Sequence, residues 1–283
     1  MNQTNATLIG VDLGGTNMRA GRVENGRIVT IETSRVPKTD DWQVVMQQLT
    51  SIISAVWSSD VAGIGVGVPG IVDSQHGTVF DIQNIPSWVK VPVGELLNQC
   101  FNVPVFVNND ANCFAAGERF FGDGREYDDF VGLITGTGLG AGIIKWGKLL
   151  PDQNCGAGEF GMIPYLDGIY EDYCSGQFFQ RVAGIGGEEL AARAAVGDTQ
   201  ALEWFKAYGQ HLANAIKTII FAIDPKAIII GGSVASSFSY YENAMFKELS
   251  YFPYSRAIQN LVVKPSRMPD VAIHGAAALC LGS

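Results

Sequence analysis

The sequence of 283 residues has little basic charge and no long apolar run. It has 19 Lys and Arg residues against 28 Asp and Glu, a formal net charge of −9 at pH 7. Proteins that bind nucleic-acid backbones usually present a basic face, so this balance argues against them. No segment reaches the roughly 20 apolar residues of a membrane span, and the N-terminus MNQTNATLIGVDLGG does not resemble a signal peptide. We therefore expect a cytoplasmic protein with no nucleic-acid or membrane partner.

Cysteine is scarce and scattered. The five cysteines show no CxxC pair, which argues against a disulfide framework and the usual metal motifs; they are Cys100, Cys113, Cys155, Cys174 and Cys280. We interpret them as reduced thiols, mostly in the core. Low-complexity segments and flexible linkers are also missing. Any domain boundary is therefore at most a hinge, which we place near Ala115.

The chain instead contains a repeated pattern of apolar strands and glycine turns. TLIGVDLGGTNMRAGRVENGRIV, residues 7–29, reads as a strand, a glycine turn and two more strands joined at Asn25-Gly26, a strong hairpin signal. DFVGLITGTGLGAGIIKWGKLL, residues 129–150, has the same layout. The repeat predicts a fold of two similar halves.

Helical periodicity appears between these strands. Apolar residues recur at helical spacing behind Asp41, at Val45, Met46, Leu49, Ile52, Ile53 and Val56. Buried strands follow at VAGIGVGVPG and VPVFVNND, and the order of strand, helix and strand predicts parallel α/β packing. In the second half we expect a long helix that ends near Asp224-Pro225, then the strand AIIIGG and a closing helix over 270–282.

Glycine turns on two matched halves can hold the phosphates of one nucleotide, with backbone N–H groups and threonine hydroxyls as donors. A plain hairpin without a ligand is the alternative for either turn alone. A dinucleotide-binding loop would need a helix after its glycines. Here Ile143, Ile144 and Trp146 follow, which is typical of a strand, so we set NAD aside.

The ordered series of motifs resembles the ROK sugar kinases, a branch of the actin-like ATPase fold that includes hexokinases. The phosphate motifs are GVDLGGTN (10–17) and GTGLGAGI (136–143), and the catalytic segment is NNDANCFAAGE (108–118). The sugar-side segments are GVGVPGIVD (65–73), QNIPSW (83–88), GAGEFG (156–161) and YEDYCSG (170–176), with DPKAIIIGGSV (224–234) on the adenosine side. The resemblance covers nearly the whole chain.

This resemblance implies an α/β fold of two actin-like (ribonuclease H-like) domains with a central cleft. We expect residues 1–115, joined by about 272–283, to form one domain and 116–271 the other. The implied activity is that of a transferase of carbohydrate metabolism: an ATP-dependent kinase of the glucokinase type. It would phosphorylate a hexose hydroxyl, that on C6, with glucose as the default substrate. Mg²⁺ as cofactor and a homodimer are further expectations from the family.

Other readings stay open. Within the family, N-acetylmannosamine, mannose, fructose or allose are alternative substrates. A non-catalytic sugar or nucleotide sensor of the same fold is a second class. An acyl-phosphate-forming kinase would place basic residues at its carboxylate substrate, whereas these motifs are rich in Asn, Asp and Glu. A DNA-binding repressor would need an N-terminal winged helix, and the phosphate strand begins within ten residues.

Asp110 is the candidate catalytic residue. It ends a buried strand before a small-residue helix, where ligand crevices of α/β sheets lie. A sugar hydroxyl that attacks a phosphate needs an acceptor for its proton, which a carboxylate can supply. The resemblance gives Asp110 this general-base role, with sugar binding, and makes Asn109 a sugar ligand. The alternative is that Asp110 only caps the helix.

Asp12 lies inside an apolar strand, and a buried acid is costly unless it is paired or near a metal. The resemblance places it near Mg²⁺, through water; a turn-stabilising aspartate is the alternative. By the same resemblance, the nucleotide contacts are Asp12 with Gly14, Gly15, Thr16, Asn17, Gly136, Thr137, Gly138 and Gly232.

The implied sugar contacts also include Asn84, Glu159 and Glu171. For the two glutamates, ordinary surface acids are the alternative. Trp88 is either sugar-facing or part of the core.

The sequence departs from the family at one loop. Most members have a histidine shortly after the position of Glu159 and then three cysteines, which together hold a structural zinc. Here Met162 takes the histidine position, and IPYLDGIY follows without Cys or His. We therefore predict no zinc site. We expect the loop to be held by packing of Met162, Ile163, Tyr165 and Tyr170.

Overall fold

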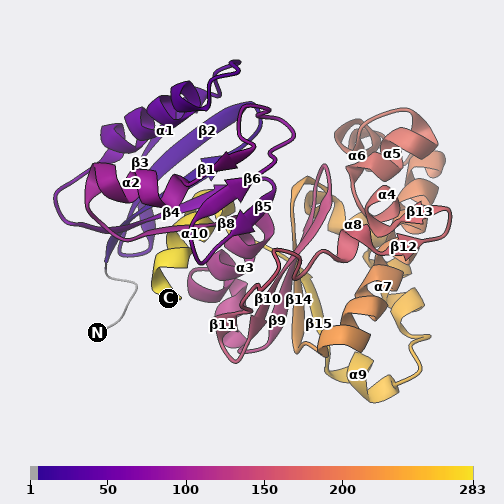
Figure 1. Cartoon of the computed structure of the whole chain (residues 1–283). Coiled ribbons are helices and arrows are strands. Elements are labelled where there is room, and N and C mark those ends of the chain that lie inside the picture. Colours follow the sequence, from indigo (N-terminus) through magenta and orange to yellow (C-terminus); the bar gives the residue numbers. More distant parts are fainter. Residues whose placement is uncertain (1–5, 283) are drawn as a thin grey trace. The chain divides into compact units, whose positions relative to one another are not determined.

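The computed structural model describes residues 6–282, which divide into two compact units. The first comprises the chain up to Glu126, Gly142–Ala157 and the chain from Arg267 onward; the second comprises Tyr127–Ala141 and Gly158–Ser266. Each unit contains helices and strands (Figure 1). The domain limits predicted from the sequence remain a prediction.

The first unit is built on a five-stranded sheet with the order β3-β2-β1-β4-β8. Strands β1, β4 and β8 are parallel, whereas β1, β2 and β3 are antiparallel neighbours. Their bounds are β1 Thr7–Leu13, β2 Asn17–Glu24, β3 Arg27–Arg35, β4 Val61–Val68 and β8 Val105–Asn109. The predicted hairpin is confirmed: Asn25 and Gly26 both have positive φ, at 51° and 74°, as a tight two-residue turn requires.

Helices cover both faces of this sheet. The predicted helix is α1 (Trp42–Val56), where the Asp41 side chain accepts a hydrogen bond from the Gln43 N–H at the N-cap. Its apolar residues pack with the aliphatic face of β1 and β4, and α2 (Val93–Phe101) adds to the same core. The predicted closing helix is α10 (Val271–Ala278), which packs on β1 and β4 and against α3 (Asp110–Phe120) (Figure 1).

Helix α10 approaches the backbone of the sheet very closely. In β4, Ile64, Val66 and Val68 point into the α1 core, and glycines alternate with them on the other face. A Cβ built on Gly65 would collide with the Ala276 carbonyl oxygen, and one on Gly10 with the Ile273 carbonyl. Glycine is therefore required at these points because any side chain would push α10 off the sheet.

Short elements that the sequence did not predict complete the first unit. A three-stranded sheet has the order β5-β6-β7, with β5 Ile71–Asp73, β6 Thr78–Phe80 and β7 Lys90–Val91. Two 3-10 turns, η2 (Asp123–Glu126) and η5 (Leu279–Leu281), follow α3 and α10. The three strands carry the loop that contains Asn84.

The second sheet repeats the topology of the first, with the order β11-β10-β9-β14-β15. Strands β9, β14 and β15 are parallel, and β10 and β11 form a hairpin. The bounds are β9 Phe130–Thr135, β10 Leu139–Lys145, β11 Lys148–Leu149, β14 Ala227–Gly231 and β15 Val262–Pro265. The boundary between the units falls within β10. The predicted internal repeat is thus confirmed at the level of strand order.

The remaining helices belong to the second unit. They are α4 Tyr170–Cys174, α5 Gly176–Ala183, α6 Gly187–Ala195, α7 Thr199–Ile223, α8 Phe238–Leu249 and α9 Ser255–Asn260. Short turns and strands lie between them: η3 Phe160–Met162, β12 Pro164–Tyr165, β13 Gly168–Ile169 and η4 Ser233–Ser237. The long helix α7 ends as predicted, because Asp224 caps it in the left-handed region before Pro225.

The structure bears on two further expectations, the state of the cysteines and the lack of a membrane-spanning helix. All five cysteines lie in the described part of the chain and are free thiols, of which Cys113 and Cys174 are buried. A search of the described helices finds none with the length and apolar character that a membrane crossing requires.

We predict that Gly65→Ala lowers the free energy of unfolding by about 3 kcal/mol, because the new methyl group must displace the α10 backbone. Gly156→Ala is the matched control: its Cβ would lie at an ordinary 3.8 Å from the Asn154 carbonyl oxygen. Urea denaturation of both variants provides the measurement. Equal stability of the two variants would contradict the close packing of α10.

Candidate active site

In the first unit, two acids lie at the same edge of the sheet. Strands β1, β4 and β8 are parallel, with Asp12 opposite Gly67 and Val68 opposite Asn109. Asp12, near the end of β1, and Asp110, directly after β8, therefore both lie at the carboxyl ends of the strands. This is the edge at which α/β sheets usually bind ligands.

Asp110 is the first residue of α3, not its cap. The cap is Asn109, whose Oδ1 accepts a hydrogen bond of 2.7 Å from the Asn112 N–H. Asp110 Oδ1 accepts a partly buried hydrogen bond of 2.8 Å from the Ala111 N–H. The structural role that was the alternative for Asp110 is thus filled by its neighbour.

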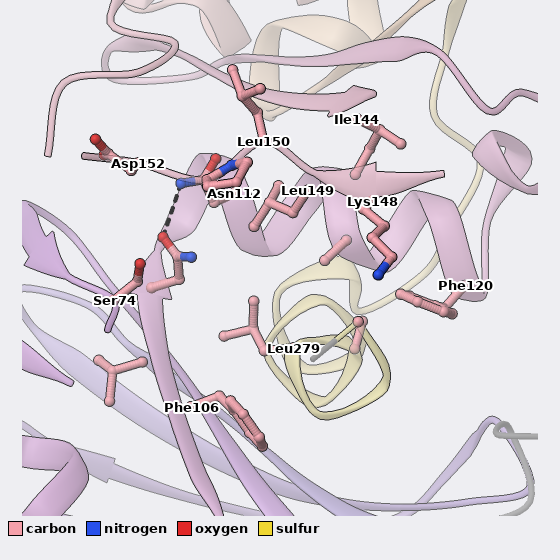
Figure 2. A pocket seen from close by; sticks show the side chains of 16 residues that line it. Ser74, Phe106, Asn112, Phe120, Ile144, Lys148, Leu149, Leu150, Asp152 and Leu279 are labelled. Carbon is pink, nitrogen blue, oxygen red and sulfur yellow. Dashed lines mark hydrogen bonds between the residues drawn. The ribbon is translucent and has the colours of Figure 1, made fainter. Parts of the chain in front are cut away.

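Two further asparagines fix the start of α3. Asn108 Oδ1 accepts hydrogen bonds from the Asn109 N–H and from Asn112 Nδ2, both at 2.9 Å. The second bond is the dashed line in Figure 2, at one side of a pocket of about 250 Å³ within the first unit. The pocket is otherwise mostly apolar and includes Phe106, Phe120, Leu149 and Leu279. This network holds Asn109 and Asp110 in place because it satisfies three polar groups around the turn.

The pKa of Asp110 is raised above its ordinary value. Desolvation by the surrounding protein is the main cause, and the negative charge of Asp12 adds to it. The Ala111 N–H opposes the shift because it stabilises the carboxylate.

Asp12 has a protein partner. Its Oδ2 accepts hydrogen bonds from Arg19 Nε at 3.2 Å and Nη2 at 2.8 Å. Arg19 also lies 3.5 Å from Asp270 Oδ1. Sequence reasoning missed Arg19, although the hairpin predicts it: β1 and β2 are antiparallel, and this register places Arg19 opposite Asp12.

The predicted phosphate turn and one predicted sugar segment share a pocket of about 780 Å³ in the first unit. The pocket contains Gly15, Thr16 and Asn17 together with Asn84, Arg35 and Lys38. A Cβ on Gly15 would collide with the Asn84 side chain. Trp88 does not contribute, since it is fully buried in the core of this unit.

In the second unit, the turn between β9 and β10 is closed by a hydrogen bond from the Gly136 N–H to the Gly138 carbonyl oxygen at 3.0 Å. The Gly176 N–H, at the start of α5, donates to the Gly136 carbonyl oxygen at 2.7 Å. Glu171 also contacts this turn: its Oε2 accepts a hydrogen bond of 3.0 Å from the Leu139 N–H. The structure therefore brings Glu171 to the predicted phosphate turn.

Gly232 directly follows β14 with φ of 88°, and a Cβ there would collide with the Thr135 carbonyl oxygen. Beside it lies a pocket of about 450 Å³ within the second unit, lined by Gly176, Phe179, Gly187, Glu188, Ala191, Phe205, Ser233, Val234, Ser236 and Ser237. The sequence indicated only the strand side of this pocket. Apart from Gly176, which ends the segment YEDYCSG, its α5 and α6 residues carry no motif that we recognised.

Glu159 is exposed and directly precedes η3, where the Met162 N–H donates to its carbonyl oxygen at 3.1 Å. Glu159 belongs to the second unit, together with Glu171 and Thr137. Asn84, Asn109, Asp110 and Asp12 lie in the first unit.

An aromatic cluster stabilises the loop after η3. Tyr165 stacks on Tyr170 with ring centroids 4.4 Å apart, and its hydroxyl lies 3.1 Å from His211 Nδ1. The prediction of Tyr165 and Tyr170 as packing residues is confirmed, whereas it is wrong for Met162, which is 59% exposed. Burial raises the pKa of Tyr165 to about 12 and lowers that of His211, so both stay neutral near pH 7.

Residues 6–282 contain no cluster of three or more His, Cys, Asp or Glu side chains that could hold a metal ion. The absence of a zinc site remains a prediction.

We predict that Tyr170→Phe lowers the free energy of unfolding by about 1 kcal/mol. The hydroxyl donates to the Asn214 carbonyl oxygen at 3.1 Å and lies 2.8 Å from Thr218 Oγ1, so both contacts are lost. Urea denaturation measures the change. Tyr251→Phe is the control, because that tyrosine is 66% exposed. If both variants unfold at the same urea concentration, the hydroxyl does not anchor the loop.

Comparison with known proteins agrees with this architecture. The model of the ROK family matches residues 8–283. A glucokinase of Thermotoga maritima is 31% identical, and the match covers 81% of this chain and 82% of that protein. An N-acetyl-D-glucosamine kinase of Vibrio vulnificus is 30% identical, and the match covers 95% of this chain and 98% of that protein.

Solved structures show the same fold. The crystal structure of a ROK family glucokinase from Streptomyces griseus in complex with glucose and AMPPNP is 27% identical. It superposes with a TM-score of 0.80 and covers 97% of this chain and 99% of that one. The predicted fold class, α/β with two actin-like domains, is therefore confirmed. Since its sequence matches the family model over almost its entire length, the chain belongs to the ROK family.

Proposed function

We propose that the protein is an ATP-dependent kinase that phosphorylates a hydroxyl group of a hexose, with glucose as the default substrate and the C6 hydroxyl as acceptor. The position of Asp110 carries the proposal. It presents a carboxylate with a raised pKa at the ligand-binding edge of its sheet, while Asn109 serves as helix cap. The similarity to a glucokinase over most of the chain supports it.

In the proposed reaction Asp110 is the general base. Its carboxylate accepts the proton of the attacking sugar hydroxyl and orients this hydroxyl toward the γ-phosphate. A raised pKa suits this role because a stronger base takes the proton more readily, provided that the group is ionised at the working pH. The asparagine network around Asn108 holds the carboxylate in position.

The glycine turns of the two sheets are the proposed phosphate-binding groups. Gly14, Gly15, Thr16 and Asn17 follow β1, and Gly136, Thr137 and Gly138 follow β9 at the equivalent place of the second sheet. Their N–H groups and threonine hydroxyls are suited to phosphate oxygens. Gly232 and the pocket beside it would take the adenosine.

The residues of the first unit fit Mg²⁺ that is held through water. Mg²⁺ usually keeps several water ligands and uses one or two carboxylates together with substrate phosphates. Asp12 offers one oxygen, Oδ1, while Arg19 contacts only Oδ2. When bound, the ion would neutralise charge on the transferring phosphoryl group.

The proposed sugar contacts are Asn84, Asn109, Asp110, Glu159 and Glu171. Amide and carboxylate groups of this kind can bind several hydroxyl groups of a hexose. An N-acetylhexosamine is the second candidate substrate, because the Vibrio vulnificus relative is named for N-acetyl-D-glucosamine. N-acetylmannosamine, mannose, fructose and allose stay within the proposed range. The domain limits at 115/116 and 271/272, a cytoplasmic location and a homodimer also belong to the proposal.

We expect Asp110→Asn to lose at least 10²-fold in turnover while it still binds the sugar, because the amide can orient a hydroxyl but cannot accept its proton. The measurement is ADP release with Mg-ATP over a panel of hexoses and N-acetylhexosamines. Asp198→Asn is the matched control: it changes an aspartate that caps α7, and asparagine caps equally well.

The same panel of sugars also tests the alternative function, that of a non-catalytic sugar or nucleotide sensor. Turnover with one sugar that is lost in Asp110→Asn would support the kinase and identify the substrate. Binding of sugars or nucleotides without turnover by the wild-type protein would instead support a sensor of the same fold.

We also predict that Asp12→Asn moves the acid limb of the pH profile of kcat/KM to lower pH. Asp110 must be ionised to act as a base, so kcat/KM falls as the pH drops through its pKa. The Asp12 charge raises this pKa; its removal, which also releases Arg19, lowers it. Desolvation, the main cause of the raised pKa, is unchanged in this variant. A limb that is unmoved, or that moves to higher pH, would contradict the coupling of these two acids.

A further inference from the structure

Glu171 makes a contact that its sequence motif does not indicate. It lies in the first turn of α4, and its Oε2 accepts a hydrogen bond from the Leu139 N–H at the end of the Gly136–Gly138 turn. The carboxylate lies so close to the turn that a Cβ on Gly138 would press against Oε2. A residue proposed to contact the sugar thus also contacts the proposed phosphate turn.

Gln177 completes the connection from α5. Its Nε2 donates to the Thr137 carbonyl oxygen at 3.2 Å and to Glu171 Oε1, also at 3.2 Å. These two bonds use both hydrogens of the amide group. The start of α5 is itself anchored, since the buried Ser175 caps the Gln177 N–H and the Gly176 N–H donates to Gly136.

A turn of this composition needs such support. Glycine loses more conformational freedom on ordering than any other residue, and this turn has two glycines in three positions. Donor groups contribute most to phosphate binding when they are already in place before the ligand arrives. Glu171 accepts from the Leu139 N–H and Gln177 donates to the Thr137 carbonyl oxygen, so these two bonds hold the turn without using the N–H groups of Thr137 and Gly138.

We propose that Glu171 and Gln177 are positioning residues that keep the Gly136–Gly138 turn in its phosphate-binding shape, and that Glu171 links the bound sugar to the nucleotide phosphates. A carboxylate accepts about four hydrogen bonds, of which Glu171 uses two within the protein, so it can also accept a sugar hydroxyl. A sugar that orders this carboxylate orders the turn, and nucleotide binding is strengthened. Linkage requires the nucleotide to strengthen sugar binding by the same factor.

This inference rests on the proposed function, and the test separates the two. Calorimetry with Mg²⁺ compares the binding of AMP and AMPPNP to the wild-type protein and to Gln177→Leu. We expect Gln177→Leu to weaken AMPPNP about fivefold, the effect of one typical hydrogen bond, and to leave AMP unchanged. AMP lacks the outer phosphates that the turn would hold, so a general loss of structure would affect both nucleotides alike.

Gln180→Leu is the matched control. Gln180 lies on the same helix, is also exposed, and donates to Gly184 rather than to the turn. We expect it to bind both nucleotides as the wild-type protein does. Equal weakening of AMP and AMPPNP by Gln177→Leu, or no change in either, overturns the positioning role. Failure of the wild-type protein to bind any of these nucleotides would instead overturn the proposed function.

The link to the sugar is measured by repeating the AMPPNP titration with a saturating amount of the acceptor sugar that the panel identifies. We expect the sugar to tighten AMPPNP binding about fivefold in the wild-type protein. In Gln177→Leu this factor should fall toward one. An equal factor in both proteins overturns the link through Glu171.

Discussion

The direct contact of α10 with the backbone of β1 and β4 is the constraint on which the first unit depends. Two glycines, Gly10 and Gly65, leave no side chain between the helix and the strands. Helix α10 in turn packs against α3 at Gly275 and Gly117, where a Cβ on either would meet the opposite helix. Because α3 begins with Asp110, the sheet, α10 and α3 together determine where the candidate catalytic carboxylate lies.

Three carboxylates of the candidate site are treated in different ways. Asp12 is paired with Arg19, and Glu171 accepts hydrogen bonds from Leu139 and Gln177. Desolvation raises the pKa of Asp110, and the negative charge of Asp12 adds to this rise. Hydrogen-bond donors or a cation beside a carboxylate stabilise its ionised form. A carboxylate that must take up a proton has fewer such partners. This difference favours Asp110 over the other two as the base.

Much of the fold could be predicted because its signals are local. The Asn25-Gly26 hairpin, α1 behind Asp41 and the end of α7 at Asp224 each follow from a few adjacent residues. The three-stranded sheet β5-β6-β7 was missed, since its strands have only two or three residues and no clear alternation. The packing of the loop that replaces the zinc site was predicted only in part. Tyr165 and Tyr170 stack on each other as expected, whereas Met162 is exposed to solvent.

The sequence by itself determined the residue types of the candidate site, the matched glycine turns and the family, because these depend on spacing along the chain. Only the tertiary structure decided how each group is used. Asn109 rather than Asp110 caps α3, and Arg19 forms an ion pair with Asp12. Glu171 reaches Leu139 across 32 positions, and Gln177 reaches Thr137 across 40. Such contacts arise when separate segments pack together, and no pattern in one stretch of sequence specifies the distance between them.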